Sequence, residues 1–166
     1  MKQFILASNF YQDIDSLMDI IAPMDFEPTL HGTEISDFEF TPTELAEKFL
    51  YILNENVEIQ LGNFRKSNSM IHFENFYQHS LWKCIVAMED NILKLFEQDN
   101  IKSFFDVANL DDFMLENSND ESKWITKATL ALKKNDFVFI RPWMWHSLSD
   151  SKLVQVFLLN QNLKET

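Results

Sequence analysis

The stretch NDFVFIRPWMWHSL, residues 135–148, combines a short apolar strand with a proline and a histidine. Its run 137–140 contains only phenylalanine, valine and isoleucine, which are typical of strands. Pro142 lacks a backbone N–H and is confined to strand ends, edges and bulges, so we expect the strand to end beside it. His146 then follows among tryptophans. A histidine in such an apolar setting is either a hydrogen-bonded core residue or a ligand, and the rest of the chain has to distinguish the two.

The composition indicates a packed, acidic protein. The chain has 166 residues, a hydrophobic content of 46% and a formal net charge of −12. This length and composition predict one domain that folds around its own core without metal or disulfide staples. Cys84 is the single cysteine, so no internal disulfide forms, and we find neither a signal peptide nor an apolar run long enough to cross a membrane. We therefore expect a cytoplasmic protein.

The charge narrows the expected partners. A strongly acidic protein repels phosphate backbones over most of its surface. We therefore expect no nucleic-acid partner and no membrane partner, and we expect a small-molecule or peptide substrate. The sequence has only 2 glycines and no glycine-rich phosphate-binding loop.

Two helices are expected near the N-terminus. Apolar residues recur at helical spacing over 14–21, after Asp13 as a start signal. Residues 41–44, Thr-Pro-Thr-Glu, match a capping box in which Thr41 caps the helix and Glu44 reaches back to it. The apolar face of this second helix would consist of Leu45, Phe49, Leu50 and Leu53.

The chain then changes to the alternating pattern of strands. The strand-like runs are 57–61, 68–74, 81–88, 91–97, 125–131, 136–141 and 152–160, and residues 99–123 form an acidic connection. About seven or eight strands of this length predict a sandwich or a barrel. We predict a single, mainly β domain. Residues 1–56 would form a short helical N-terminal part, and residues 57–160 the β-barrel.

The stretch NSMIHFENF, residues 68–76, provides a second set of candidate ligands. In an extended strand alternate side chains share a face, so Met70, His72 and Glu74 point the same way. A histidine and a carboxylate on one strand face, together with a distant histidine, make up the set of two histidines and one carboxylate that holds non-heme iron. His72, Glu74 and His146 are therefore the candidate metal ligands. The alternative is a strand-edge histidine beside a solvated glutamate, with the distant histidine in the core.

The order of these motifs resembles that of the cupin superfamily, whose members fold as a double-stranded β-helix, or jelly-roll barrel. LKKNDFVFIRPWMWHSL, residues 132–148, is similar to the second cupin motif, and IHFENF, residues 71–76, occupies the place of the first. SFFDVANLDDF, residues 103–113, resembles the segment between the motifs. The His-x-Glu pair and the aromatic residues before the last histidine are most similar to the JmjC-like Fe(II)/2-oxoglutarate oxygenases. The resemblance covers residues 57–160 and implies an Fe(II) site and hydroxylation of a substrate C–H bond.

The resemblance also implies a basic residue that holds the far carboxylate of 2-oxoglutarate. JmjC-like oxygenases usually place a lysine for this purpose on a strand after the His-x-Glu pair. Here Lys83, Lys94 and Arg141 are the candidate cofactor-binding residues, and none of them matches that position: Lys94, for example, has the opposite strand parity. Two alternatives stay open. One is a metal-binding cupin without 2-oxoglutarate, acting as a dioxygenase, isomerase or lyase on a small molecule, and the other is a non-catalytic, ligand-binding cupin.

The tryptophans beside His146 give a further expectation. Because Pro142 interrupts the strand, we expect the segment after it to form a loop at the barrel mouth. At least one indole, of Trp143 or Trp145, would then approach the metal and form a wall of the substrate pocket.

Overall fold

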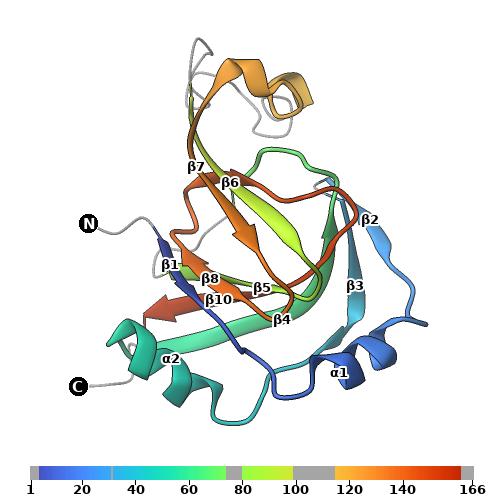
Figure 1. Ribbon diagram of the computed structural model, residues 1–166, viewed down its shortest axis with the longest axis vertical. Coiled ribbons are helices and arrows are strands. Elements are labelled where there is room, and N and C mark those ends of the chain that lie inside the picture. Colours follow the sequence, from blue (N-terminus) through green and yellow to red (C-terminus); the bar gives the residue numbers. More distant parts are fainter. Residues whose placement is uncertain (1–3, 31, 74–79, 99–114, 162–166) are drawn as a thin grey trace.

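The computed structural model describes residues 4–30, 32–73, 80–98 and 115–161 (Figure 1). Most of its elements are antiparallel strands, arranged in a large and a small sheet. The large sheet has the order β1-β8-β5-β10-β4-β3-β2, and the small sheet the order β7-β6-β9. The strands are β1 (Phe4–Ala7), β2 (Glu27–Thr29), β3 (Gly32–Glu39), β4 (Val57–Ser67), β5 (Ser80–Ala87), β6 (Asn91–Gln98), β7 (Trp124–Leu132), β8 (Phe137–Ile140), β9 (Trp145–Ser147) and β10 (Leu153–Gln161).

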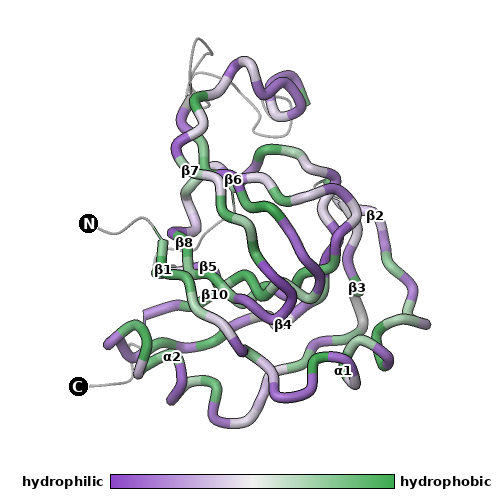
Figure 2. The backbone as a smooth tube through the Cα atoms, in the orientation of Figure 1, coloured by the Kyte–Doolittle hydropathy of each residue, from purple (hydrophilic) through white to green (hydrophobic). Residues whose placement is uncertain are grey.

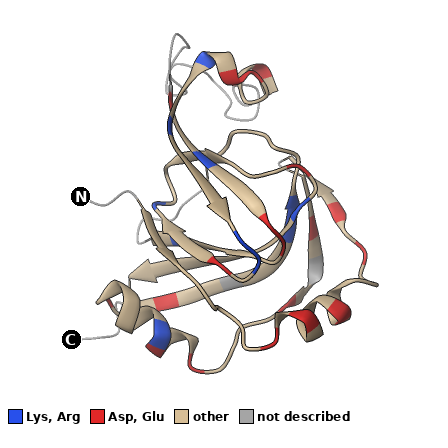
Figure 3. Cartoon of the chain, in the orientation of Figure 1, with Lys and Arg blue, Asp and Glu red and all other residues tan. Residues whose placement is uncertain are grey.

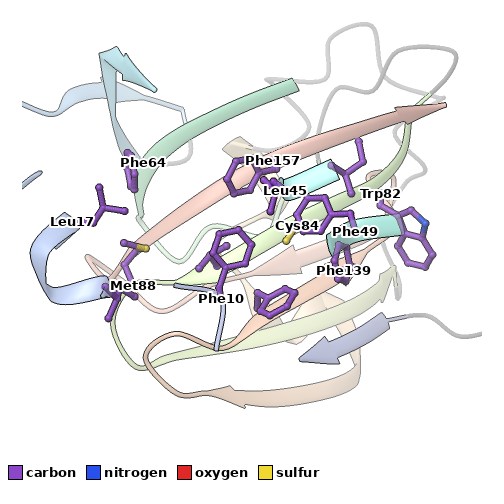
Figure 4. Close-up of a cluster of buried hydrophobic side chains, with 14 of the residues drawn as sticks. Phe10, Leu17, Leu45, Phe49, Phe64, Trp82, Cys84, Met88, Phe139 and Phe157 are labelled. Carbon is purple, nitrogen blue, oxygen red and sulfur yellow. The ribbon is translucent and has the colours of Figure 1, made fainter. Parts of the chain in front are cut away.

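The large sheet has two buried faces, each with its own core. One face packs against the helices, in a cluster that includes Phe49, Phe139 and Phe157 (Figure 4). The other face packs against the small sheet, in a cluster that includes Leu95 and Val156. Because its central strands are covered on both sides, they are apolar along most of their length rather than alternating, as the colours of β5 and β10 show in Figure 2.

The alternation of side chains along β5 decides what enters the space between the sheets. Trp82, Cys84 and Val86 belong to the helix-facing core. Ile85 belongs to the core between the sheets. Since successive side chains of a strand point to opposite faces, Lys83 lies on the same side as Ile85. A lysine is therefore placed inside the barrel, with an exposed fraction of 1%.

The first helix, α1 (Ile14–Ile21), is the one predicted. The carboxylate of Asp13 accepts a hydrogen bond from the backbone N–H of Ser16 and caps its N-terminus. Ile14, Leu17 and Ile21 are buried against the large sheet. Among the described residues, no helix combines the length and the apolar character needed to span a membrane.

The second helix, α2 (Leu45–Leu53), begins later than the sequence predicted, and the capping box is not formed. Its N-cap is Glu44, which has φ 63° and makes no side-chain capping bond. Just before Thr41, the N–H of Phe40 donates to the carbonyl of Gly62 on β4, so the chain there is still held against the sheet. The predicted apolar face is buried at Leu45, Phe49 and Leu53, but Leu50 is 40% exposed.

Asparagine takes the place of glycine in the turn before β8. Asn135 has φ 76°, a left-handed conformation that asparagine tolerates better than other non-glycine residues. Its side chain also ties down the N-terminal segment, because its Oδ1 accepts from the N–H of Tyr11 at 2.8 Å and its Nδ2 donates to the carbonyl of Tyr11 at 2.7 Å. The carboxylate of Asp136 closes the same turn by accepting from the N–H of Lys133.

The N-terminal part contributes strands as well as helices. β1 pairs with β8 at one edge of the large sheet, and β3 pairs with β4 towards the other edge. Figure 1 shows the two helices on the side of the large sheet away from β6 and β7. The helical layer therefore leaves the space between the sheets to the barrel's own side chains.

Candidate metal centre

His72 and His146 lie directly opposite each other across a short antiparallel bridge. The N–H of His72 donates to the carbonyl of His146 at 2.9 Å, and the N–H of His146 donates to the carbonyl of His72 at 2.8 Å. Residues that exchange both hydrogen bonds in this way have their side chains on the same face of the ladder. The imidazole rings accordingly lie side by side, with centroids 4.3 Å apart.

Both rings face the interior of the barrel. His146 of β9 pairs with Leu95 of β6, whose side chain belongs to the core between the sheets. Met144, two positions before His146, packs against the same core. The exposed fractions of His72 and His146 are 4% and 0%. The two histidines named by the sequence motifs are therefore brought together at a buried site.

The hydrogen bonds of the rings orient their other nitrogen atoms. Nδ1 of His72 lies 2.9 Å from the carbonyl of Met70, and Nδ1 of His146 lies 2.9 Å from the carbonyl of Met144. A carbonyl oxygen only accepts, so each Nδ1 carries the proton. In the neutral ring, each Nε2 then keeps a lone pair, and a backbone carbonyl fixes the ring in position, as in metal-binding histidines. In each ring, Nε2 is therefore the nitrogen that could bind a divalent metal ion.

Lys83 reaches this pair from the facing sheet. Its Nζ lies 2.8 Å from Nε2 of His146. Because Nδ1 of His146 carries the proton, Nε2 is the acceptor and Lys83 donates. The sequence had named Lys83 as one of three basic candidates, and the strand alternation of β5 is what places it at the histidines.

A cavity of about 180 Å³ opens beside the histidine pair. Among its described lining residues the charged ones are mostly basic, namely Arg65, Lys66 and Lys83, with Glu34 as the carboxylate. Oε2 of Glu34 accepts from Nδ2 of Asn63 at 3.1 Å and lies 3.7 Å from Nε of Arg65. The other described lining residues are Thr29, Thr33, Ser67, His72, Leu148, Val154 and Val156.

Sequence reasoning missed the polar residues that β4 and β3 contribute to this cavity. Asn63, Arg65 and Ser67 occupy alternate positions of β4 and so share one face, and a row of polar residues on one face is typical of a strand with a solvated side. In the structure this polar face is turned into the barrel, where Arg65 pairs across the sheet with Val154. Nothing in the local pattern distinguishes a polar cavity wall from a solvated surface.

The other sequence-predicted site residues are not at the histidines. Glu74 lies outside the described residues, and its role as third ligand stays a prediction. Lys94 lies on the outer face of β6, where its Nζ is 2.9 Å from Oε1 of Glu121, and it lines a separate cavity of about 300 Å³. Arg141 donates from Nη1 to the carbonyl of Leu81 and stacks on Trp82, with Cζ 3.6 Å from the ring centroid.

Among the described residues, neither Cys84 nor a third nearby ligand completes the histidine pair. Within the described ranges, no group of three His, Cys, Asp or Glu side chains is placed to hold a metal ion. Cys84 is completely buried in the helix-facing core, and this burial raises the pKa of its thiol well above the usual range. A thiol held protonated in this way is neither a nucleophile nor a ready ligand.

Trp145 does not form the expected wall of the site. The chain after Pro142 returns to extended structure in β9, so Met144 shares the inner side with His146 while Trp145 faces outwards, opposite Phe96. Its ring packs against Phe73 and Trp124, with centroid distances of 4.8 Å and 5.0 Å. Trp145 is not among the residues that line the cavity beside the histidines.

We therefore expect Trp145→Ala to change stability more than ligand binding. The side chain is partly buried, so the loss should be about 1–3 kcal/mol, below the 3–5 kcal/mol of a fully buried aromatic residue. Urea unfolding measures this loss, and a Ni(II) titration of the folded variant should change its affinity by less than about 2-fold, because the carbonyl contacts of His146 do not involve the indole. Weakened ligand binding at unchanged stability would show instead that Trp145 lines the ligand pocket, as the sequence suggested.

Comparison with known proteins supports the fold. No protein-family model matches the sequence, and no curated protein matches it significantly. The structure is similar to HygX from Streptomyces hygroscopicus with nickel and 2-oxoglutarate bound, with a TM-score of 0.60 and 10% identity over 97% of this chain and 84% of that chain. The same protein with nickel, 2-oxoglutarate and hygromycin B bound gives a TM-score of 0.59 at 8% identity, with the same coverage. The likeness shows that this mainly β chain has a cupin-like, jelly-roll barrel fold, as its motifs predicted.

Proposed function

We propose that this protein is a cupin-fold, Fe(II)- and 2-oxoglutarate-dependent oxygenase of the JmjC-like kind. His72, Glu74 and His146 would hold the metal. The observation that carries the proposal is the buried histidine pair, in which each Nδ1 is bonded to a backbone carbonyl so that each Nε2 is oriented to coordinate. HygX, which shares the fold, has been crystallised with nickel and 2-oxoglutarate.

The charge of the cavity supports a small dianion as cosubstrate. The protein carries a net charge of −12, and Figure 3 shows carboxylates along α1 and β2. The cavity has the opposite character, since 3 of the 14 lysine and arginine residues line it, with Glu34 as the single carboxylate among its described lining residues. A local excess of basic groups favours an anion, and the planar guanidinium of Arg65 matches a carboxylate in two-point contact. We infer that Arg65 and Lys83 hold the far carboxylate of 2-oxoglutarate.

The remaining side chains prepare the site for this chemistry. Bound Fe(II) with 2-oxoglutarate supplies the oxidising power for hydroxylating a C–H bond of a small-molecule or peptide substrate. The carbonyls of Met70 and Met144 keep the imidazole rings in place. Leu148, Val154 and Val156 provide the apolar part of the cavity wall.

The test is a calorimetric titration of 2-oxoglutarate into the Ni(II)-loaded protein, with Arg65→Met and Lys94→Met alongside. Nickel avoids oxidation during the measurement. We expect saturable binding to the parent and roughly a 10-fold or greater weakening in Arg65→Met, because a hydrogen bond to a charged group contributes about 1.5–3 kcal/mol. Lys94→Met is the matched control and should bind as the parent does, because Lys94 is paired with Glu121 outside the barrel.

Two other outcomes would favour the alternatives. Metal binding without any heat from millimolar 2-oxoglutarate would favour a metal-dependent dioxygenase, isomerase or lyase acting on a small molecule. Binding of 2-oxoglutarate in the presence of EDTA, with no metal bound at any concentration, would favour a non-catalytic ligand-binding module. The hydrogen bond from Lys83 to His146 is the observation that favours the non-catalytic module, because an ammonium group can stabilise the histidine pair without a metal.

A further inference from the structure

Lys83 contacts the same atom of His146 that a metal ion would use. Nζ of Lys83 donates to Nε2 of His146 at 2.8 Å, and both residues are almost completely buried. Nε2 has one lone pair, which either accepts this hydrogen bond or binds a metal ion. Nδ1 of the same ring is already bonded to the carbonyl of Met144, so the ring has no second nitrogen to offer. Metal binding at His146 therefore requires the ammonium group to move.

The cavity gives the ammonium group of Lys83 room to move, and a bound anion would give it a new hydrogen-bond acceptor. Lys83 lines the same volume of about 180 Å³ as Arg65 and Ser67. Leaving Nε2 deprives a buried ammonium group of a hydrogen bond, which is unfavourable unless another acceptor replaces it. A carboxylate held near Arg65 would be such an acceptor.

We propose that Lys83 couples the binding of the metal to the binding of a small carboxylate anion. In the absence of the anion, Lys83 masks His146 and weakens metal binding. When the anion occupies the cavity, Lys83 turns to its carboxylate and Nε2 becomes available. Because coupling between two sites is reciprocal, the metal in turn strengthens binding of the anion. This inference rests on the proposed metal site at His72 and His146. It adds that an anion in the cavity makes this site available to the metal.

The experiment measures Ni(II) affinity by competition with a chromophoric chelator, with and without glutarate. Glutarate has two carboxylates but no 2-oxo group, so it lacks the chelating pair with which 2-oxoglutarate would itself hold the metal. In the parent protein, glutarate should raise the Ni(II) affinity within the roughly 5–150-fold range of typical site coupling. Lys83→Met keeps the length of the side chain but cannot donate, so it should bind Ni(II) more tightly than the parent without glutarate, and glutarate should change this affinity by less than about 2-fold. The control Lys94→Met should respond as the parent does.

A spectroscopic measurement on the parent protein tests the coupling even if the Lys83→Met variant does not fold. In a ¹⁵N spectrum of the histidine rings recorded without metal, glutarate should shift the Nε2 resonance of His146, because its hydrogen bond to Lys83 is lost, and should leave Nδ1 bonded to Met144. An unshifted Nε2 resonance at saturating glutarate would overturn the coupling.

The outcomes separate the coupling from the proposed function. If parent and Lys83→Met both bind Ni(II) with the same affinity, Lys83 does not mask His146 and the coupling is wrong, while the metal site stands. If Lys83→Met binds no Ni(II) even though its fold is intact, the histidine pair is not a metal site and both proposals fall. Tighter binding that appears only in Lys83→Met supports the coupling directly.

Discussion

Replacing His146 by alanine is expected to abolish tight metal binding while the fold remains. Loss of a group that merely orients a metal ligand already weakens binding by 10–100-fold, so loss of the ligand itself should exceed about 100-fold. The same result is expected for His72→Ala, because the two imidazoles lie on one face of the bridge with centroids 4.3 Å apart. Metal content after loading with Fe(II) under anaerobic conditions, measured by elemental analysis, reports the effect.

The control for these variants is Ser147→Ala. Ser147 follows His146 on β9, but it pairs with Lys94 on the outer side of the small sheet and lines the separate outer cavity. Its removal should leave the metal content unchanged. Equal iron in the parent, His72→Ala and His146→Ala would eliminate the proposed ligand set, whatever Glu74 contributes.

The largest loss of stability is expected for Phe49→Ala. Phe49 is 0% exposed and joins α2 to the large sheet, with ring centroids 5.1 Å from Phe139 and 6.2 Å from Phe157. Truncation of a buried phenylalanine removes its contacts and leaves a cavity, so the free energy of unfolding should fall by about 3–5 kcal/mol. Equilibrium unfolding in urea measures this change.

Tyr51 provides the matched control on the same helix. Its side chain is 90% exposed, so Tyr51→Ala should change the free energy of unfolding by no more than about 0.5 kcal/mol. Folded Phe49→Ala should also keep the metal affinity of the parent, because the helices cover the face of the large sheet opposite to the histidines. A loss below about 1 kcal/mol in Phe49→Ala would show that α2 contributes little to the core.

The elements that were predicted correctly are those whose own residues determine them. α1 has a capping carboxylate and apolar residues at helical spacing, and its bounds match the prediction. β8 and β10 are buried on almost every residue, so an apolar run between turn residues was enough to locate them. For these segments, local propensity and tertiary environment agree.

The elements that were missed depend on their neighbours. β2 (Glu27–Thr29) is exposed at every position and is extended because it pairs with β3. β9 has only three residues, and pairing with β6 on one side and with His72 on the other defines it. No pattern within such short segments carries this information, because the hydrogen bonds come from residues distant in the sequence.

In the candidate site, too, some residues could be predicted from local sequence and others only from the fold. His72 and His146 were predicted from motifs that contain them, and the structure places them together. Lys83 could be selected over Lys94 only once the sheets were known, because both lie on apolar strands and differ only in which face they occupy. Arg65 could not be predicted, because its polar strand face resembles a solvated surface until the structure places His72 and Lys83 at the same cavity.

The pairing of β1 with β8 sets the order in which the chain can fold during synthesis. The N–H of Tyr11 bonds to a side chain 124 positions later, that of Asn135, and β1 finds its only described strand partner beyond that residue. A ribosome adds about 5–20 residues per second, so the apolar N-terminal strand waits for several seconds before its partner exists. During this interval it needs protection from aggregation. The edge strand is therefore made well before its partner and docks late, and the histidine bridge, which also needs β9, forms in the same late step.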